Sequence, residues 1–239
     1  MPSGVELVAG TPARVLAIYA HPDDADVSCG GTLARWAAAG AEVHSVVVTS
    51  GDKGSTEPGA DPCELVARRA REVAASGAVL GLAGQQLLGY PDGEIEADRA
   101  LRAELVRIIR ALRPEVVVCP DPEAVLFGQD YVNHRDHRVV GWATLDAAAP
   151  AAALPLYFPE AGPAHQVETM YLSGTLVPDV WVDVSGTVGL KIAAVLCHAS
   201  QVGESTAWLG DAVRQRAAEA GRAAGVGHAE AFRRLRLRG

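Results

Sequence analysis

The stretch Arg14-Val-Leu-Ala-Ile-Tyr-Ala20 is a short apolar run with the composition of a buried strand, and His21-Pro22-Asp23-Asp24 follows it directly. Further strand-like runs and helix-like segments alternate after it, with strands at 43–49, 85–90 and 115–119 and helices at 29–40, 64–80 and 98–112. Strands separated by helices of this length form a parallel sheet that is covered on both faces. The sequence therefore predicts an α/β fold, a Rossmann-like layered sandwich with a mostly parallel sheet.

The second half of the chain is less regular. It predicts helices at 137–146, 191–199 and 207–224, strands at 167–173 and 180–184, and a loop rich in Ala and Pro at 147–163. The arginine-rich segment Arg233–Arg238 is interpreted as a short tail. Because no internal repeat and no long linker interrupts the chain, we expect a single domain over residues 1–239.

Composition excludes several classes of protein. The 239 residues include 29 acidic and 21 basic side chains, and this net charge of -8 gives no general footprint for nucleic acid or acidic membranes. The four cysteines form no Cys-x-x-Cys pair, which disfavours a zinc ribbon or a disulfide framework. Neither a signal peptide within residues 1–13 nor a bilayer-length apolar run is evident. We expect a reduced, cytoplasmic, soluble protein, compatible with a homo-oligomer.

The first polar cluster lies at the end of the first strand, where ligands bind in open parallel sheets. A dinucleotide-binding domain would carry Gly-x-Gly-x-x-Gly there, but this chain carries His21, Asp23 and Asp24. An imidazole with adjacent carboxylates favours metal ligation or acid–base chemistry over phosphate binding. The alternative is that Asp23 or Asp24 only caps the next helix.

The second polar cluster, Asn133-His134-Arg135-Asp136-His137-Arg138, follows the fourth predicted strand. Histidines at i and i+3 can face the same way on a helical turn, although such a segment alone could equally be a solvated charged turn. Because both clusters should project from the same edge of the sheet, together they indicate a catalytic zinc with three protein ligands and an open water position. A nearby carboxylate that is not a ligand could act as general base.

These two clusters carry a resemblance to a known family. The run from Ala20 to Leu33 resembles the signature of the PIG-L/LmbE family of zinc-dependent N-acetylglucosaminyl deacetylases, and the segment 134–137 resembles the second motif of that family. Weaker matches are found at 50–52, 69–72 and 89–93, so the resemblance covers roughly residues 14 to 200. It implies an LmbE-like fold and a zinc-dependent hydrolase that removes an acetyl group from a small-molecule N-acetylated amino sugar or conjugate.

The resemblance also implies roles for individual residues. His21, Asp24 and His137 would be the zinc ligands, and Asp23 would be the general base that activates a water molecule on the zinc. His134 would stabilise the oxyanion or protonate the leaving amine. The chain departs from the family at two positions, since Ala25 stands where Glu is frequent and Arg135 stands where Pro is common. Neither departure affects a proposed ligand.

Three further residues have two interpretations each. Asp92, in Pro91-Asp92-Gly93, could bind substrate hydroxyls or orient His134, but it could equally be a turn residue. Arg69 could bind a substrate oxygen, although we favour a solvated helix charge paired with Glu72. His198 is a single histidine on a predicted helix, and we interpret it as structural.

Two rival functions remain open. Asp24-Ala-Asp26-Val-Ser28 imitates the Asp-x-Asp pattern of metal-dependent phosphohydrolases, but that interpretation leaves His21, His134 and His137 without a role. The other rival is a non-catalytic sugar-binding or metal-binding protein on the same scaffold. No residue favours it, because every proposed ligand and the proposed base are present.

Overall fold

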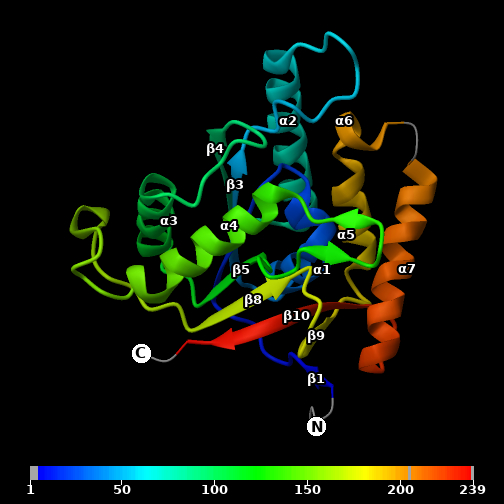
Figure 1. Cartoon of the computed structure of the whole chain (residues 1–239). Coiled ribbons are helices and arrows are strands. Elements are labelled where there is room, and N and C mark those ends of the chain that lie inside the picture. Colours follow the sequence, from blue (N-terminus) through cyan, green and yellow to red (C-terminus); the bar gives the residue numbers. More distant parts are fainter. Residues whose placement is uncertain (1–4, 204–205, 238–239) are drawn as a thin grey trace.

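A computed structural model describes residues 5–203 and 206–237, and its centre is an eight-stranded sheet in the order β1-β9-β10-β8-β5-β2-β3-β4. Five neighbouring strands run parallel to one another: β8 (Thr169–Ser173), β5 (Val116–Pro120), β2 (Arg14–Tyr19), β3 (Glu42–Thr49) and β4 (Gly84–Tyr90). The predicted α/β class with a mostly parallel, layered sheet is confirmed (Figure 1).

Helices cover both faces of the sheet. The bounds are α1 Asp24–Ala38, α2 Pro62–Leu80, α3 Arg99–Leu112, α4 Arg135–Asp146, α5 Val188–Leu196, α6 Ala199–Val202 and α7 Thr206–Ala224. Side chains of β2 alternate between the faces, because successive residues of a strand point to opposite sides. Leu16 and Ile18 pack in the cluster that contains α3 and α4, whereas Val15 and Tyr19 pack in the cluster that contains α1. Helices α2, α5 and α7 join α1 on that second face.

The prediction of a short arginine-rich tail at 233–238 is wrong, because the described part of this segment belongs to a strand. β10 (Ala229–Arg236) lies antiparallel between β8 and β9 (Val180–Asp183), and β1 (Glu6–Leu7) pairs with the far side of β9. Phe232 in β10 is fully buried, while Arg233 pairs with Glu123 and Arg234 pairs with Glu6. Partner carboxylates thus let an arginine-rich segment act as an inner strand. Arg238 lies outside the described residues.

Three predicted segments differ in detail. α1 begins at Asp24 rather than near residue 29, so the first polar cluster runs directly into the helix, which has one non-helical residue at Cys29. The predicted helix 191–199 is α5 followed by the short α6, and His198 lies between them. The loop at 147–163 contains a π-helical turn and a 3-10 turn, η1 (Ala147–Ala151) and η2 (Pro159–Ala161).

Two short elements near the carboxyl edge have no counterpart among the predicted ones. β6 (Leu126–Phe127) and β7 (Tyr131–Val132) form an antiparallel hairpin between β5 and α4, coloured green in Figure 1. Among the described residues, no helix is long and apolar enough to cross a membrane.

Candidate metal centre

The two polar clusters meet at the carboxyl edge of the sheet. His21 and Asp24 stand between β2 and the first turn of α1, and His137 stands in the first turn of α4. His21 Nδ1 lies 3.1 Å from Asp24 Oδ2 and 3.1 Å from His137 Nε2, and His137 Nε2 lies 3.1 Å from Asp24 Oδ1. Ligand atoms on one tetrahedral zinc lie roughly 3.3–3.6 Å apart, because Zn–N and Zn–O bonds are about 2.0–2.2 Å long. The three side chains can therefore hold one metal ion.

Hydrogen bonds to neighbouring residues determine which nitrogen of each imidazole is available to bind a metal ion. His21 Nε2 faces Asp92 Oδ1 at 3.1 Å, so Nε2 carries a hydrogen and Nδ1 is the nitrogen that can bind a cation once its own proton is lost. Asn133 Nδ2 donates to the Ala124 carbonyl at 2.7 Å, which turns Asn133 Oδ1 toward His137 Nδ1 at 2.9 Å. His137 Nδ1 must then donate, and Nε2 is left to bind a cation. Asn133 and its role are a feature that the sequence interpretation missed.

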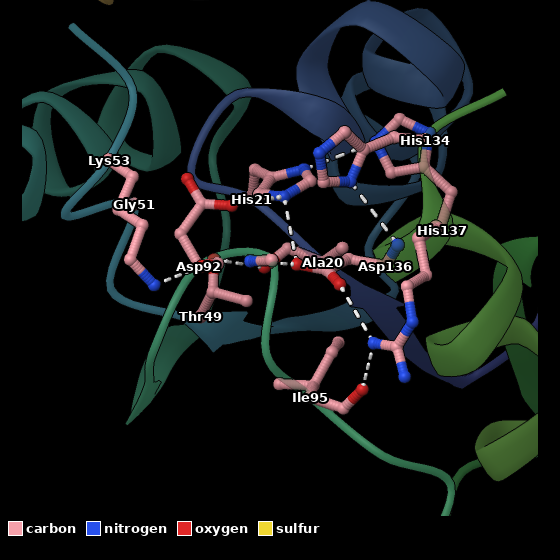
Figure 2. A network of polar contacts seen from close by, with 12 residues as sticks. Ala20, His21, Thr49, Gly51, Lys53, Asp92, Ile95, His134, Asp136 and His137 are labelled. Atoms are coloured by element: carbon pink, nitrogen blue, oxygen red, sulfur yellow. Dashed lines mark hydrogen bonds and ion pairs between the residues drawn. The ribbon is translucent and has the colours of Figure 1, made fainter. Parts of the chain in front are cut away.

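A second possible group, formed by His21, His134 and Asp136, competes for the same histidine. Asp136 is fully buried, and it accepts a hydrogen bond from the Gly93 amide at 2.7 Å and lies 3.5 Å from His21 Nε2. Figure 2 shows His21 with Asp92 and Asp136 close to it. Since Nε2 of His21 is taken by these carboxylates, the set of His21, Asp24 and His137 fits an ion better.

Charge around His21 matches a cation site. Burial alone would lower the pKa of His21, but the carboxylates of Asp136, Asp24 and Asp92 raise that pKa to about 12 in the metal-free protein. The imidazoles of His137 and His21 in turn hold the pKa of Asp24 far below its usual range, despite its burial. The site is built to stabilise positive charge, which a metal ion supplies better than a proton.

Asp23 is not a helix cap in the usual sense. It stands at the N-cap position of α1, yet its side chain makes no capping hydrogen bond, so the capping alternative fails for this residue. Its Oδ1 lies 3.3 Å from Arg69 Nη2. Burial raises the pKa of Asp23, the charge of Asp24 adds to that increase, and Arg69 opposes it.

A second prediction is wrong, namely that Arg69 is a solvated charge on its helix, because Arg69 is buried. Its side chain is 3% exposed, and Nη1 donates to the Gly51 carbonyl at 3.2 Å. The neighbouring Arg68 is the residue that pairs with Glu72. Gly51 has a φ of +67°, which favours glycine at this turn, and a Cβ there would overlap Arg69 Nη1.

Asp92 lies in a turn, as one of its two interpretations predicted, but it does not orient His134. Gly93 follows it with a φ of +78°, which makes the segment a turn, while the Asp92 carboxylate contacts His21 rather than His134. Lys53 Nζ donates to the Asp92 carbonyl at 2.6 Å (Figure 2). The Asp52 carboxylate accepts the Asp92 amide at 2.8 Å. Asp92 is therefore held firmly against the site.

His134 lies beside His21, Asp24 and His137 without joining them. Its ring centroid is 4.7 Å from that of His21, in an edge-on arrangement. His134 Nδ1 accepts a hydrogen bond from the Asp136 amide at 3.2 Å, so Nε2 carries the ring hydrogen. Burial and the charge of His21 lower the pKa of His134. His134 thus presents a neutral N–H donor.

His198 and Asp26 form a pair away from His21, Asp24 and His137. His198 is buried between α5 and α6, and its Nε2 lies 2.7 Å from Asp26 Oδ2. This agrees with the structural interpretation of His198. Arg135, one of the two departures from the family motif, contacts the Ile95 carbonyl and Glu96 rather than His21, Asp24 or His137.

The fold and the site define the class first: an α/β protein with two histidines and one aspartate around a single point at the carboxyl edge of a parallel sheet. Residues 16–148 match the model of the PIG-L family, described as GlcNAc-PI de-N-acetylase. The chain belongs to this family.

Known relatives extend the likeness along the chain. Diacetylchitobiose deacetylase from Thermococcus kodakarensis is 33% identical over 195 residues, which is 80% of this chain and 71% of that protein. The 1D-myo-inositol 2-acetamido-2-deoxy-alpha-D-glucopyranoside deacetylase from Rhodococcus jostii is 29% identical and covers 79% of this chain and 82% of its own length. The solved N,N'-diacetylchitobiose deacetylase from Pyrococcus horikoshii superposes with a TM-score of 0.85 at 30% identity, over 94% of this chain and 84% of that one.

Proposed function

We propose that the chain is a zinc-dependent hydrolase that removes an acetyl group from an N-acetylated amino sugar or a related conjugate. The observation that carries this proposal is the close approach of His21, Asp24 and His137. The two imidazole nitrogens lie 3.1 Å apart, and each lies 3.1 Å from one of the two Asp24 carboxylate oxygens. Asp23 and His134 lie beside this group. Amide hydrolysis needs an electrophile for the carbonyl, a base for water and a proton for the departing nitrogen. This cluster supplies groups suited to each need.

Zinc suits the donor set. Two imidazole nitrogens and one carboxylate, leaving a position for water, are typical of catalytic zinc, and hydrogen bonds from outer partners to each histidine strengthen such ligands. Bound at these residues, zinc supplies a Lewis acid that lowers the pKa of water and polarises a carbonyl.

Asp23 is the proposed general base. A carboxylate with a raised pKa lies nearer to neutral pH and is a better proton acceptor than an ordinary aspartate. Arg69 holds the carboxylate in place at 3.3 Å. His134, through its Nε2 hydrogen, donates to the carbonyl oxygen as charge develops there, or gives a proton to the departing nitrogen.

The substrate's sugar is proposed to bind in an open polar hollow beside these residues. Its walls include Lys53, Arg69, Asp92 and Gln201, together with Asp23 and His134. Within the described part of the chain, Arg69 Nε has no hydrogen-bond partner. Charged and amide side chains of this kind bind sugar hydroxyls, and the two curated relatives act on N-acetylated sugars by their names.

The phosphohydrolase alternative loses its support. Its Asp-x-Asp pattern requires Asp24 and Asp26 to face one ion, but residues two apart on a helix point apart. Asp26 contacts the buried His198 and not the ligand cluster. A non-catalytic binding protein would keep the ligands and lose the base, and Asp23 is present next to them.

The proposal is tested first by elemental analysis of the purified protein beside His137→Ala. About one zinc per chain, largely lost in the variant, is the expected result. Asp23→Asn serves as the matched variant, since it should retain zinc while the rate of acetate release from N-acetyl amino sugars falls by about 10²- to 10⁴-fold. Absence of zinc after reconstitution, or full activity of Asp23→Asn, would contradict the proposal.

A further inference from the structure

Two hollows of different character adjoin the ligand cluster. The polar hollow includes His21 among its walls, and a cavity of about 480 Å³ includes the other two proposed ligands, Asp24 and His137. Phe127 and Tyr131, from the β6–β7 hairpin, contribute aromatic rings to this cavity. A reacting amide at the cluster would therefore have one half in polar and the other half in largely apolar surroundings.

Several polar groups in the cavity wall already have hydrogen-bond partners, and Ser28 and Arg216 also line this cavity. The Tyr19 hydroxyl and Ser173 Oγ are 2.7 Å apart. The Asn133 side-chain amide is hydrogen-bonded to His137 and to the Ala124 carbonyl. The paired groups have little left to offer to sugar hydroxyls, and a buried hydroxyl without a partner is costly. The wall favours an apolar occupant.

The cavity continues beneath α7. A second cavity of about 280 Å³ lies between α7, α5 and β10, and its walls include Leu209, Val213 and Ala217. Val27, Ser28, Gly174 and Arg216 line both cavities, so the two adjoin. In Figure 1, α7 flanks α5 and the start of β10, on the same side as the green hairpin.

Together these spaces exceed what an acetyl group needs. An apolar cavity of about 150 Å³ already accommodates a benzene ring. The first cavity alone has about 480 Å³, and the second extends it away from the ligands. A cavity this large beside a reacting amide gives no advantage to a single methyl group, whereas a chain of methylenes gains free energy with each group buried.

We propose that this site takes N-acyl amino sugars with linear acyl chains longer than acetyl, from butyryl to octanoyl, and binds the chain in the two adjoining cavities. The proposal rests on the amidase function proposed above. Hydrolysis joins the oxygen of water to the acyl carbon and breaks the carbon–nitrogen bond, and the nitrogen takes up a proton. The products are a free fatty acid and the free amino sugar.

The test is a chain-length series with the zinc-loaded protein and N-acetyl-, N-butyryl-, N-hexanoyl- and N-octanoylglucosamine, following release of the free amine. Each buried methylene is worth about fourfold in kcat/KM, so the butyryl amide, which has two more methylenes, should exceed the acetyl amide by about fifteenfold. Hydrolysis of the acetyl amide with equal or lower kcat/KM for every longer chain would overturn this inference and leave the proposed function intact. If no amide in the series were hydrolysed, both would be overturned.

A pair of variants locates the chain. Ser28→Phe places a ring where the two cavities adjoin, and it should lower the octanoyl-to-acetyl ratio of kcat/KM by at least about tenfold. Ala223→Phe is the matched control, since Ala223 is exposed on α7 and lines neither cavity, and its ratio should equal that of the unmodified protein. Thermal unfolding reports whether each variant is folded. An unchanged ratio in folded Ser28→Phe would overturn the proposal. If this variant does not fold, the chain-length series with the unmodified protein still tests the proposal.

Discussion

Asn133→Ala should weaken zinc binding about 10- to 100-fold, although no proposed ligand atom is changed. Asn133 is buried and accepts a hydrogen bond from His137 Nδ1 at 2.9 Å, which selects the tautomer with a free lone pair on Nε2. Without this partner the imidazole can rotate or place its hydrogen on the wrong nitrogen. The expected loss corresponds to about 1.4–2.7 kcal/mol of binding free energy.

A chelator competition at constant pH measures that affinity, and Asn133→Asp is the control. The aspartate keeps an oxygen for His137 Nδ1 but cannot donate to the Ala124 carbonyl, which Asn133 does at 2.7 Å. We expect near-normal zinc affinity in this variant, together with a loss of about 1–2 kcal/mol in the free energy of unfolding. A folded Asn133→Ala protein that binds zinc within about twofold of the unmodified chain would refute the positioning argument.

Three other perturbations follow from buried charges. Arg110 is 3% exposed, and its five N–H groups lie within hydrogen-bond distance of six backbone carbonyls of the segment 151–162. Arg110→Leu should cost about 3–5 kcal/mol of unfolding free energy in urea titrations, and a cost below about 1 kcal/mol would contradict this role. Lys191→Met should cost a similar amount, because it leaves Glu230 buried without its cation at 2.5 Å, and adding Glu230→Gln should recover part of the loss. As the pH is lowered, the affinity for zinc should fall about tenfold per pH unit for each proton that zinc must displace. The raised pKa of His21, about 12, keeps the metal-free imidazole protonated at neutral pH, so zinc must displace that proton and binds better as pH rises; a pH-independent affinity between about pH 6 and 8 would contradict this expectation.

Local patterns were sufficient for the parallel half of the sheet. The apolar run of β2 and the β-branched run of β3 are buried on both faces, and buried parallel strands have that composition regardless of what packs on them. The carboxyl edge then places His21 and His137 together by topology alone. The fold class and the meeting of the two clusters could therefore be read from the sequence.

β10 could not be read in this way, because its stability depends on distant partners. Its charges are neutralised by Glu6, Glu123 and Lys191, which are remote in the sequence, and Glu230 also accepts the amides of Gly31 and Thr32 in α1. A local window contains only the arginines, which are typical of a solvated tail. The same holds for Asn133, whose role depends on where the Ala124 carbonyl lies.

Arg69 differs from these cases, because the sequence around it does contain a local pattern that indicates its burial. Arg69, Val73, Ser76 and Leu80 follow one another at spacings of four, three and four residues, and all four are buried on one face of α2. An arginine within an otherwise buried stripe needs a partner inside the protein. A helix that follows a parallel strand also begins at the carboxyl edge of the sheet, so the early turns of α2 lie nearest to the ligand cluster. A charge that sits on the buried face of such a helix, close to its start, therefore points to the site.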